Sequence, residues 1–289
     1  MAYCLYEVDK EKRIATITFN KPEKLHAMTP PNDPQEVIDL ISQADRDDNV
    51  AVIVFKGSGK CYGAGYDLKS VREVRGFHEE KRPSQRRRWK GVDDWWGRRA
   101  ILQKIISCDK ATISQVHGYC YGGHLEMMFA CDLAVASEDA TFTHPGYTYI
   151  GVEGPIPLYV LCMGWRKVKE MMLIGKTLTA AEAHEFGMIN RVVPRADLEV
   201  ETMKWAEIIG QRPLDGIVIG KKEFLIAMDF MGLSAGYELA TFSHSFMSNL
   251  KFGENEFNLM KELRDGGKKG MYKTRDEKVK REGDLMKKD

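Results

Sequence analysis

The sequence predicts an α/β fold, and two observations support this prediction. Residues 51–56 and 111–116 are short runs rich in β-branched side chains, as expected of buried strands. Each run is followed by a glycine-rich loop and then by a helical pattern, which begins near Tyr66 in the first case and at His124 in the second. With 289 residues, 43% of them hydrophobic, the chain is long enough to bury a large core.

The elements of the first half follow the same pattern. Residues 13–19 alternate like a half-buried strand, and residues 20–24 form a turn around Pro22. Three further prolines precede a helix expected over residues 37–44. The strand at residues 51–56 leads into a loop of glycines and small residues at 57–65, and residues 66–68 begin the next helix.

In the second half, residues 111–116 form a strand, the glycines and aromatics up to Gly123 form a loop, and residues 124–131 form an apolar helix. A strand follows at 133–137. A helix over residues 164–176 ends at Gly175, and Thr179 with Glu182 has the form of a capping box. The chain is helical from residue 198 onward, with a break at 210–213 and helices at 217–228 and 235–249.

Charge and cysteine usage limit the class of protein. The formal net charge of +1 gives no overall field that favours nucleic acid or an anionic membrane, so we expect neither as a partner. The six cysteines form no C-x-x-C pair, and no long apolar segment is present. We therefore expect a reduced, cytoplasmic protein without structural zinc, in which Cys120 is a small buried side chain and not a nucleophile.

The loop and helix at residues 122–126 carry the clearest chemical signal. Gly122 and Gly123 allow the backbone to approach a ligand closely. The first N–H groups of the helix have no intrahelical acceptor and lie at the positive end of its dipole, which suits an anion or a developing oxyanion. Glu126 lies about one turn further on. A carboxylate beside such donors is an arrangement for acid/base catalysis.

Four short sequence motifs follow one another along the chain. They are Asn20-Lys21-Pro22 with His26-Ala27-Met28; Ala64-Gly65-Tyr66-Asp67; His117-Gly118 through Gly122-Gly123 to Glu126 and Cys131-Asp132; and an Ala-Glu-Ala-x-x-x-Gly pattern that starts at Ala181 and leads to Val193. Together they resemble the crotonase family, that is, the enoyl-CoA hydratase/isomerase superfamily. The resemblance extends from residue 1 to about residue 265.

The resemblance implies a crotonase-like spiral of repeated ββα units with a C-terminal α-helical oligomerisation region. The core with the CoA and active sites would cover residues 1–199, a helical packing and trimerisation region residues 200–265, and a charged tail residues 266–289. It also implies a homotrimer or a dimer of trimers. The substrate would be an acyl-CoA thioester, so that coenzyme A enters with the substrate, and we expect no separate cofactor and no metal.

Site residues follow from the same resemblance, position by position. The backbone N–H groups of Tyr66 and Gly123 would form the oxyanion hole, and Glu126 would be the principal acid/base group. The residues implied in binding the substrate and CoA are Lys24, Ala27, Ala64, Asp67, Leu68, Gly122 and Tyr147. Near the C-terminus, Lys268, Lys269 and Lys273 are open alternatives for contact with the CoA phosphates.

One departure from the family pattern affects the mechanism. Two-carboxylate hydratases of the family have a second glutamate after a proline, but here Gly146 follows Pro145, or Tyr147 takes the position if the gap is moved. Glu153 is the nearest carboxylate and the candidate second catalytic group. His144, Tyr147 and Tyr149 are further candidates. His124 stands where the family often has glycine. Its side chain could donate a hydrogen bond or point away along the helix, and we expect the second.

The function predicted is reversible hydration of an α,β-unsaturated acyl-CoA through an oxyanion-stabilised enolate. Double-bond isomerisation, or decarboxylation or C–C hydrolysis of a cyclic acyl-CoA, remain alternatives, and a non-catalytic member that binds CoA or RNA is a third. Residues 82–99 combine seven basic residues with Trp89, Trp95 and Trp96. The basic residues suit the outer face of a helix over the site, and the tryptophans suit either a bulky or cyclic acyl group or a neighbouring subunit.

Overall fold

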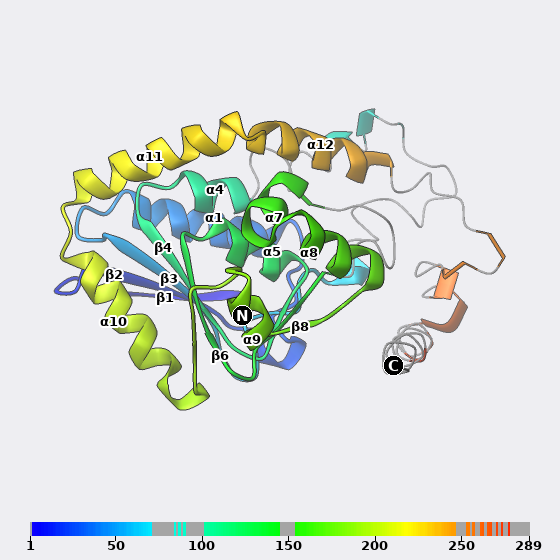
Figure 1. The fold of residues 1–289 in the computed structure, drawn as a ribbon, viewed down its shortest axis with the longest axis horizontal. Coiled ribbons are helices and arrows are strands. Elements are labelled where there is room, and N and C mark those ends of the chain that lie inside the picture. Colours follow the sequence, from blue (N-terminus) through cyan, green and yellow to red (C-terminus); the bar gives the residue numbers. More distant parts are fainter. Residues whose placement is uncertain are drawn as a thin grey trace.

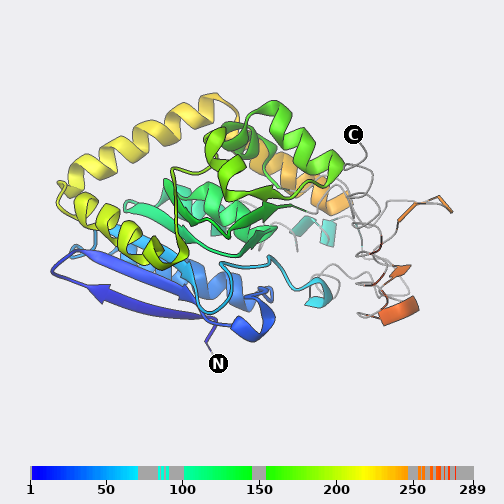
Figure 2. The ribbon, with the colours of Figure 1, turned by 60° about the horizontal axis from the view of Figure 1, so that its bottom comes forward.

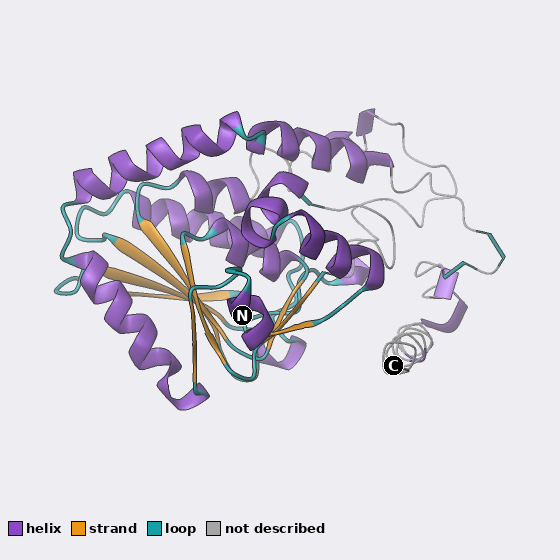
Figure 3. Cartoon of the chain, in the orientation of Figure 1, coloured by secondary structure: helices purple, strands orange, loops and turns teal. Residues whose placement is uncertain are grey.

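The computed structural model describes residues 2–70, 84, 86–87, 89–90, 101–144 and 154–246, with short pieces between residues 253 and 277. Its main feature is a six-stranded sheet in the order β1-β2-β3-β4-β6-β9 (Figures 1 and 3). The strands are β1 (Cys4–Asp9), β2 (Ile14–Phe19), β3 (Val52–Gly57), β4 (Ala111–Val116), β6 (Leu133–Ser137) and β9 (Arg191–Val193). Only the β1–β2 pair is antiparallel, and the other pairs are parallel.

A second, three-stranded sheet contains β5 (Tyr119–Tyr121), β7 (Thr141–Thr143) and β8 (Leu178–Thr179). The chain repeatedly leaves a strand of the large sheet, forms a short strand of the small sheet and continues toward a helix: β4 leads to β5 and then to α5 (Gly123–Ala130), and β6 leads to β7. After β3 the chain follows the same course, because Gly63 forms a parallel bridge with Cys120 of β5. The predicted ββα repetition is therefore confirmed.

Helices cover both faces of the large sheet (Figure 2). The side chains of Ile53 and Phe55 pack into the cluster that contains residues of α1 (Asn32–Asp45), α4 (Ile101–Ser107) and α5. Those of Val52 and Val54 pack into the opposite cluster, with Ala206 of α10 (Leu198–Gly210). This alternation follows from the two-residue period of a strand. Burial on both faces explains why residues 52–55 form a continuous apolar run.

The remaining helices lie in the loop after β2 and in the second half of the chain. The short ones are the 3₁₀-helices η1 (Pro22–Lys24) and η3 (Arg195–Asp197), α8 (Trp165–Lys169), the π-helix η2 (Glu170–Ile174) and α9 (Ala180–Glu185), and the longer ones are α7 (Ile156–Met163), α11 (Leu214–Phe230) and α12 (Leu233–Phe246). The predicted capping box is confirmed, since the Thr179 hydroxyl accepts from Glu182 N–H and the Glu182 carboxylate accepts from Thr179 N–H. Gly175 ends the π-helix in the left-handed region, as its position predicts.

Several elements differ from the sequence prediction. Residues 119–121, expected to be a loop, form the strand β5, and the elements that were not predicted are the strands β1, β7, β8 and β9 and the helices α4 and α7. Within residues 82–99, Trp89 packs edge-on against Phe242 of α12 with ring centroids 5.8 Å apart, whereas Trp95 and Trp96 lie outside the described residues. Among the helices that the structure describes, none is long and apolar enough to span a membrane.

Candidate active site

Two loops lie side by side at the carboxyl ends of β2 and β3. Met28 and Tyr66 form a parallel bridge, in which Met28 N–H donates to the Gly65 carbonyl at 2.9 Å and Asp67 N–H donates to the Met28 carbonyl at 2.8 Å. Ala64 N–H also donates to the Leu25 carbonyl at 2.9 Å. The loop that follows β2 therefore holds the backbone on both sides of Tyr66.

The N-terminus of α5 lies against the same loop. A Cβ atom built on Gly65 would lie 3.1 Å from the backbone nitrogen of Gly123, and one built on Gly123 would lie 2.5 Å from the Tyr66 ring. Both positions therefore require glycine. Gly123 is the first residue of α5, so its N–H has no acceptor within the helix. The structure thus brings together the backbone segments that carry the two predicted donors, Tyr66 N–H and Gly123 N–H, which are 57 residues apart in the sequence.

Glu126 lies in the first turn of α5 and is 1% exposed. Its Oε1 accepts a hydrogen bond of 2.7 Å from the Tyr159 hydroxyl and lies 3.6 Å from Nε2 of His144. Its Oε2 is buried and has no hydrogen-bond partner among residues 2–70, 101–144 and 154–246. The described residues therefore hold one carboxylate oxygen by a hydrogen bond and leave the other without one. A buried polar atom without a hydrogen bond lowers the stability of the fold.

Two further groups surround this carboxylate. Gly154 has φ of +80°, and a Cβ atom built on it would lie 2.3 Å from Glu126 Oε1. Tyr237 enters from α12, and burial, followed by the negative charge of Glu126, raises the pKa of its phenol well above the ordinary value. In the described part of the chain its Oη, like Glu126 Oε2, has no hydrogen-bond partner. The C-terminal helices therefore contribute to the environment of the site.

The structure brings most of the predicted site residues together. Lys24 and Ala27 lie in the loop after β2, Ala64 and Asp67 in the loop after β3, and Gly122 precedes α5. The Asp67 carboxylate accepts from Lys69 N–H at 2.8 Å and thereby caps the helical turn that begins at Leu68. Glu153, Tyr147, Tyr149 and Gly146 lie outside the described residues.

Sequence reasoning missed Tyr159 and Tyr237. Tyr159 is 33 residues from its partner Glu126, and neither tyrosine belongs to a motif that would have identified it. His144 was a candidate, and its buried ring does lie beside Glu126 and edge-on to Tyr159. Cys120 is fully buried, as predicted, and burial raises the pKa of its thiol.

Comparison with known proteins identifies relatives in sequence and in structure. The sequence profile of enoyl-CoA hydratase/isomerase matches residues 9–257. A putative enoyl-CoA hydratase of Mycobacterium tuberculosis is 31% identical over 250 residues, which cover 82% of this chain and 77% of the relative. A hydroxycinnamoyl-CoA hydratase-lyase of Pseudomonas fluorescens is 32% identical over 203 residues, covering 69% of this chain and 70% of the relative. The crystal structure of a probable enoyl-CoA hydratase from Mycobacterium smegmatis is 30% identical, with a TM-score of 0.75, and the match covers 86% of this chain and 95% of that one.

Proposed function

The chain belongs to the enoyl-CoA hydratase/isomerase family, and from this premise we propose that it catalyses the reversible hydration of an α,β-unsaturated acyl-CoA. The observation that carries the proposal is the Glu126 carboxylate, which is buried one turn beyond Gly123 and has one oxygen fixed by Tyr159 and the other without a partner in the described residues. An oriented carboxylate with an unused acceptor is suited to hold and deprotonate a water molecule.

In the proposed reaction, the N–H groups of Tyr66 and Gly123 bind the thioester oxygen. Water adds to the β-carbon and gives its proton to Glu126, and the negative charge that develops on the thioester oxygen is stabilised by the two N–H donors. A proton is then delivered to the α-carbon, which gives the β-hydroxyacyl-CoA. Donors of this kind each contribute about 100- to 1000-fold to the rate. Coenzyme A takes part only as a portion of the substrate.

The second carboxylate of the proposed hydration is Glu153. Glu153 itself is outside the described residues, so the support comes from its neighbour in sequence, Gly154, whose backbone lies against Glu126 Oε1. A pair of carboxyl groups can divide the work, one as base toward water and the other as acid toward the α-carbon.

Double-bond isomerisation is the second candidate, and it also rests on an observation. The contacts that the structure describes around the Glu126 carboxylate come from a phenol, an imidazole and a glycine, none of which is a second carboxylate. One carboxylate is sufficient for isomerisation, because it can remove a proton from one carbon and return it to another.

Isotope labelling separates the candidate functions. The protein is incubated with crotonyl-CoA and, because one relative acts on a hydroxycinnamoyl-CoA, with 4-hydroxycinnamoyl-CoA, in ¹⁸O-labelled water and in deuterium oxide. Hydration places ¹⁸O on the β-carbon and deuterium on the α-carbon. Isomerisation, tested with a 3-enoyl-CoA, moves the double bond without ¹⁸O incorporation. A non-catalytic CoA binder produces neither change.

Glu126→Gln is the corresponding variant, and Glu185→Gln, at an exposed position in α9, is its control. An enzyme that uses Glu126 loses several orders of magnitude in kcat with little change in CoA affinity, whereas the control keeps its rate. Equal rates for wild type and Glu126→Gln would exclude Glu126 as the acid/base group.

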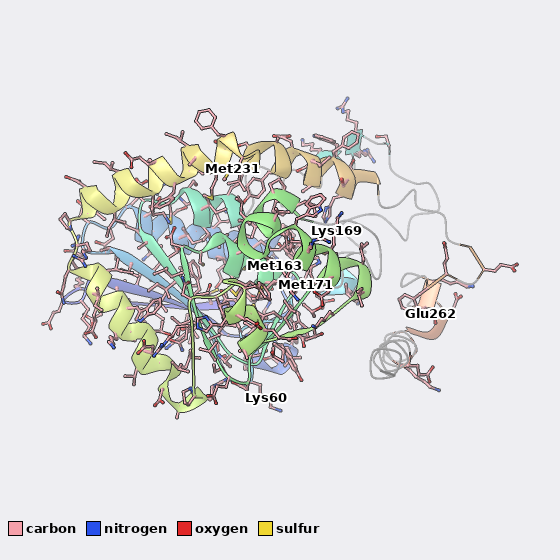
Figure 4. The ribbon with its side chains drawn as sticks, viewed as in Figure 1. Lys60, Met163, Lys169, Met171, Met231 and Glu262 are labelled. Carbon is pink, nitrogen blue, oxygen red and sulfur yellow. The ribbon has the colours of Figure 1, made fainter. Side chains whose placement is uncertain are left out.

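We also propose that the protein is a homotrimer or a dimer of trimers that assembles through α11 and α12. These helices run end to end along one edge of the molecule, and Met231 marks their junction (Figure 4). Among residues 214–230, no side chain is buried, although several are large and apolar: Ile219, Phe224, Ile226 and Phe230 are 60%, 73%, 57% and 89% exposed. Several large, exposed apolar side chains on one helix are typical of a protein–protein interface.

A further inference from the structure

The side chain of His124 lies beneath the loop that carries Tyr66. The ring is fully buried, and its Nδ1 accepts a hydrogen bond of 3.0 Å from Gly65 N–H. A Cβ atom built on Gly63 would lie 2.1 Å from the ring, so glycine at position 63 leaves the space that the ring occupies. Phe19 packs edge-on against the ring at a centroid distance of 4.9 Å and Tyr62 at 5.9 Å. The expectation that this side chain only points away along the helix is therefore wrong.

The hydrogen bonds determine the tautomer of this histidine. A backbone N–H can only donate, so Nδ1 of His124 must be unprotonated and Nε2 must carry the hydrogen. Nε2 lies 3.0 Å from the Tyr3 hydroxyl, which in turn donates to the His26 carbonyl at 2.9 Å. Burial, followed by the effect of nearby His26, lowers the pKa of His124 to about 3, so the ring is neutral at ordinary pH. Every hydrogen-bonding atom of the ring is then satisfied.

The ring holds the peptide group that precedes Gly65 and so lies next to the peptide group that carries the Tyr66 N–H. Gly65 is held at both ends, since its N–H donates to His124 and its carbonyl accepts from Met28 N–H at 2.9 Å. The peptide between Gly65 and Tyr66 is planar, so the direction of the Gly65 carbonyl also determines the direction of the Tyr66 N–H. In addition, His124 directly follows Gly123 in α5. A single residue therefore connects the two backbone segments that carry the proposed oxyanion donors.

We propose that His124 is a positioning residue, which sets the spacing and orientation of the Tyr66 and Gly123 N–H groups, and that Tyr3 supports it from behind. This inference rests on the proposed function, because it assumes that these two N–H groups bind the thioester oxygen. The effect is expected to be large, because a displacement of about 1 Å at a reacting group can cost 100-fold in rate.

Two variants at position 124 test the role of the acceptor. His124→Asn retains a hydrogen-bond acceptor at the δ position and can still bind Gly65 N–H, whereas His124→Leu has similar bulk and no acceptor. Tyr62→Phe is the control, because Tyr62 packs on the same ring but its hydroxyl pairs with Ser114 at 3.0 Å and not with Gly65. We expect His124→Leu to lower kcat by about 10- to 100-fold with less than a threefold change in KM, since loss of an entire oxyanion donor costs about 100- to 1000-fold.

The second readout is the carbonyl stretch of bound butyryl-CoA labelled with ¹³C at the thioester carbon, measured by infrared difference spectroscopy. This saturated thioester cannot be hydrated, so the probe reports the polarisation of the carbonyl without turnover. We expect the wild type, His124→Asn and Tyr62→Phe to shift the stretch to lower wavenumber, and His124→Leu to lose most of that shift. A role in packing alone would change the melting temperature but not the shift.

The outcomes distinguish this inference from the proposed function. If His124→Leu retains the wild-type carbonyl shift and a kcat within twofold, or if His124→Asn is as defective as His124→Leu, the positioning role is refuted. If wild type shifts the carbonyl but adds no water to any enoyl-CoA, hydration is wrong and the positioning role stands. Should His124→Leu fail to fold, Tyr3→Phe provides the test, because it removes the acceptor of Nε2 and leaves the ring in place. A shift and kcat equal to those of wild type in Tyr3→Phe would then refute the inference.

Discussion

Replacement of Gly154 with alanine is expected to displace the Glu126 carboxylate without unfolding the protein. The added Cβ atom would lie 2.3 Å from Glu126 Oε1 and 2.8 Å from the Tyr159 hydroxyl. Because ordinary contacts of a Cβ atom begin at 3.4 Å, the carboxylate must move by about 1 Å, a displacement that can cost about 100-fold in rate. Gly154 also has φ of +80°, and alanine in that region loses about 1–2 kcal/mol of stability.

A second glycine separates the two effects. Gly187 has the same φ of +80°, but a Cβ atom built on it meets nothing within 4 Å. Both alanine variants should therefore lose similar stability in urea unfolding, while only Gly154→Ala loses kcat/KM with an enoyl-CoA substrate. The reasoning is refuted if Gly154→Ala keeps its rate within threefold of wild type, or if Gly187→Ala loses activity to the same degree.

Three further predictions follow from individual contacts. Tyr159→Phe removes the 2.7 Å hydrogen bond to Glu126, and since bonds to charged groups contribute about 1.5–3 kcal/mol, we expect kcat to fall about 10- to 100-fold in steady-state assays. Burial lowers the pKa of His124 to about 3 and that of His117 to about 4, so below pH 6.5 the unfolded chain binds protons that the folded chain does not. At pH 5 each of these histidines should lower the free energy of unfolding by about 2 kcal/mol. In urea unfolding, the free energy of unfolding should therefore fall between pH 7.5 and pH 5 by about 2 kcal/mol less in His117→Gln than in wild type. Phe230→Lys places a charge on the apolar surface of α11 and should reduce the mass measured by light scattering.

Local patterns were sufficient to predict much of the fold. The strands β2, β3, β4 and β6 are short segments rich in apolar and β-branched residues, a composition that is typical of strands. β5 is different, because Tyr119–Tyr121 is a strand only through its pairing with β7, about 20 residues further on. β1 is an edge strand whose side chains are partly exposed, so its pattern is weaker than that of the buried strands. Pairing with a partner distant in sequence therefore determines β5, whereas β1 pairs with its neighbour β2 and escapes prediction because its own pattern is weak.

The site shows the same division. Gly123 and Glu126 belong to one short motif, so their proximity follows from the geometry of a helix turn. The phenol that binds Glu126 comes from α7, and the Gly65 N–H that binds His124 is 59 residues away in sequence. The positions of such partners depend on how the helices pack around the sheet. A motif therefore predicts the reacting group more readily than the groups that orient it.

The variant Glu153→Gln distinguishes between hydration and double-bond isomerisation, the two reactions proposed for a site with Glu126 as its fixed carboxylate. If Glu153 is the acid that protonates the α-carbon, glutamine at this position should lower hydration by about 100- to 10,000-fold, the usual contribution of general acid/base catalysis. If Glu126 alone shuttles a proton between carbons, the rate of isomerisation of a 3-enoyl-CoA should stay within a few-fold of wild type. Glu138→Gln, in the turn after β6, controls for the loss of one negative charge. If Glu153→Gln keeps both reactions, Glu126, with its Oε1 held by Tyr159, performs both proton transfers. A carboxyl group can do this because it can release through one oxygen the proton that it received on the other.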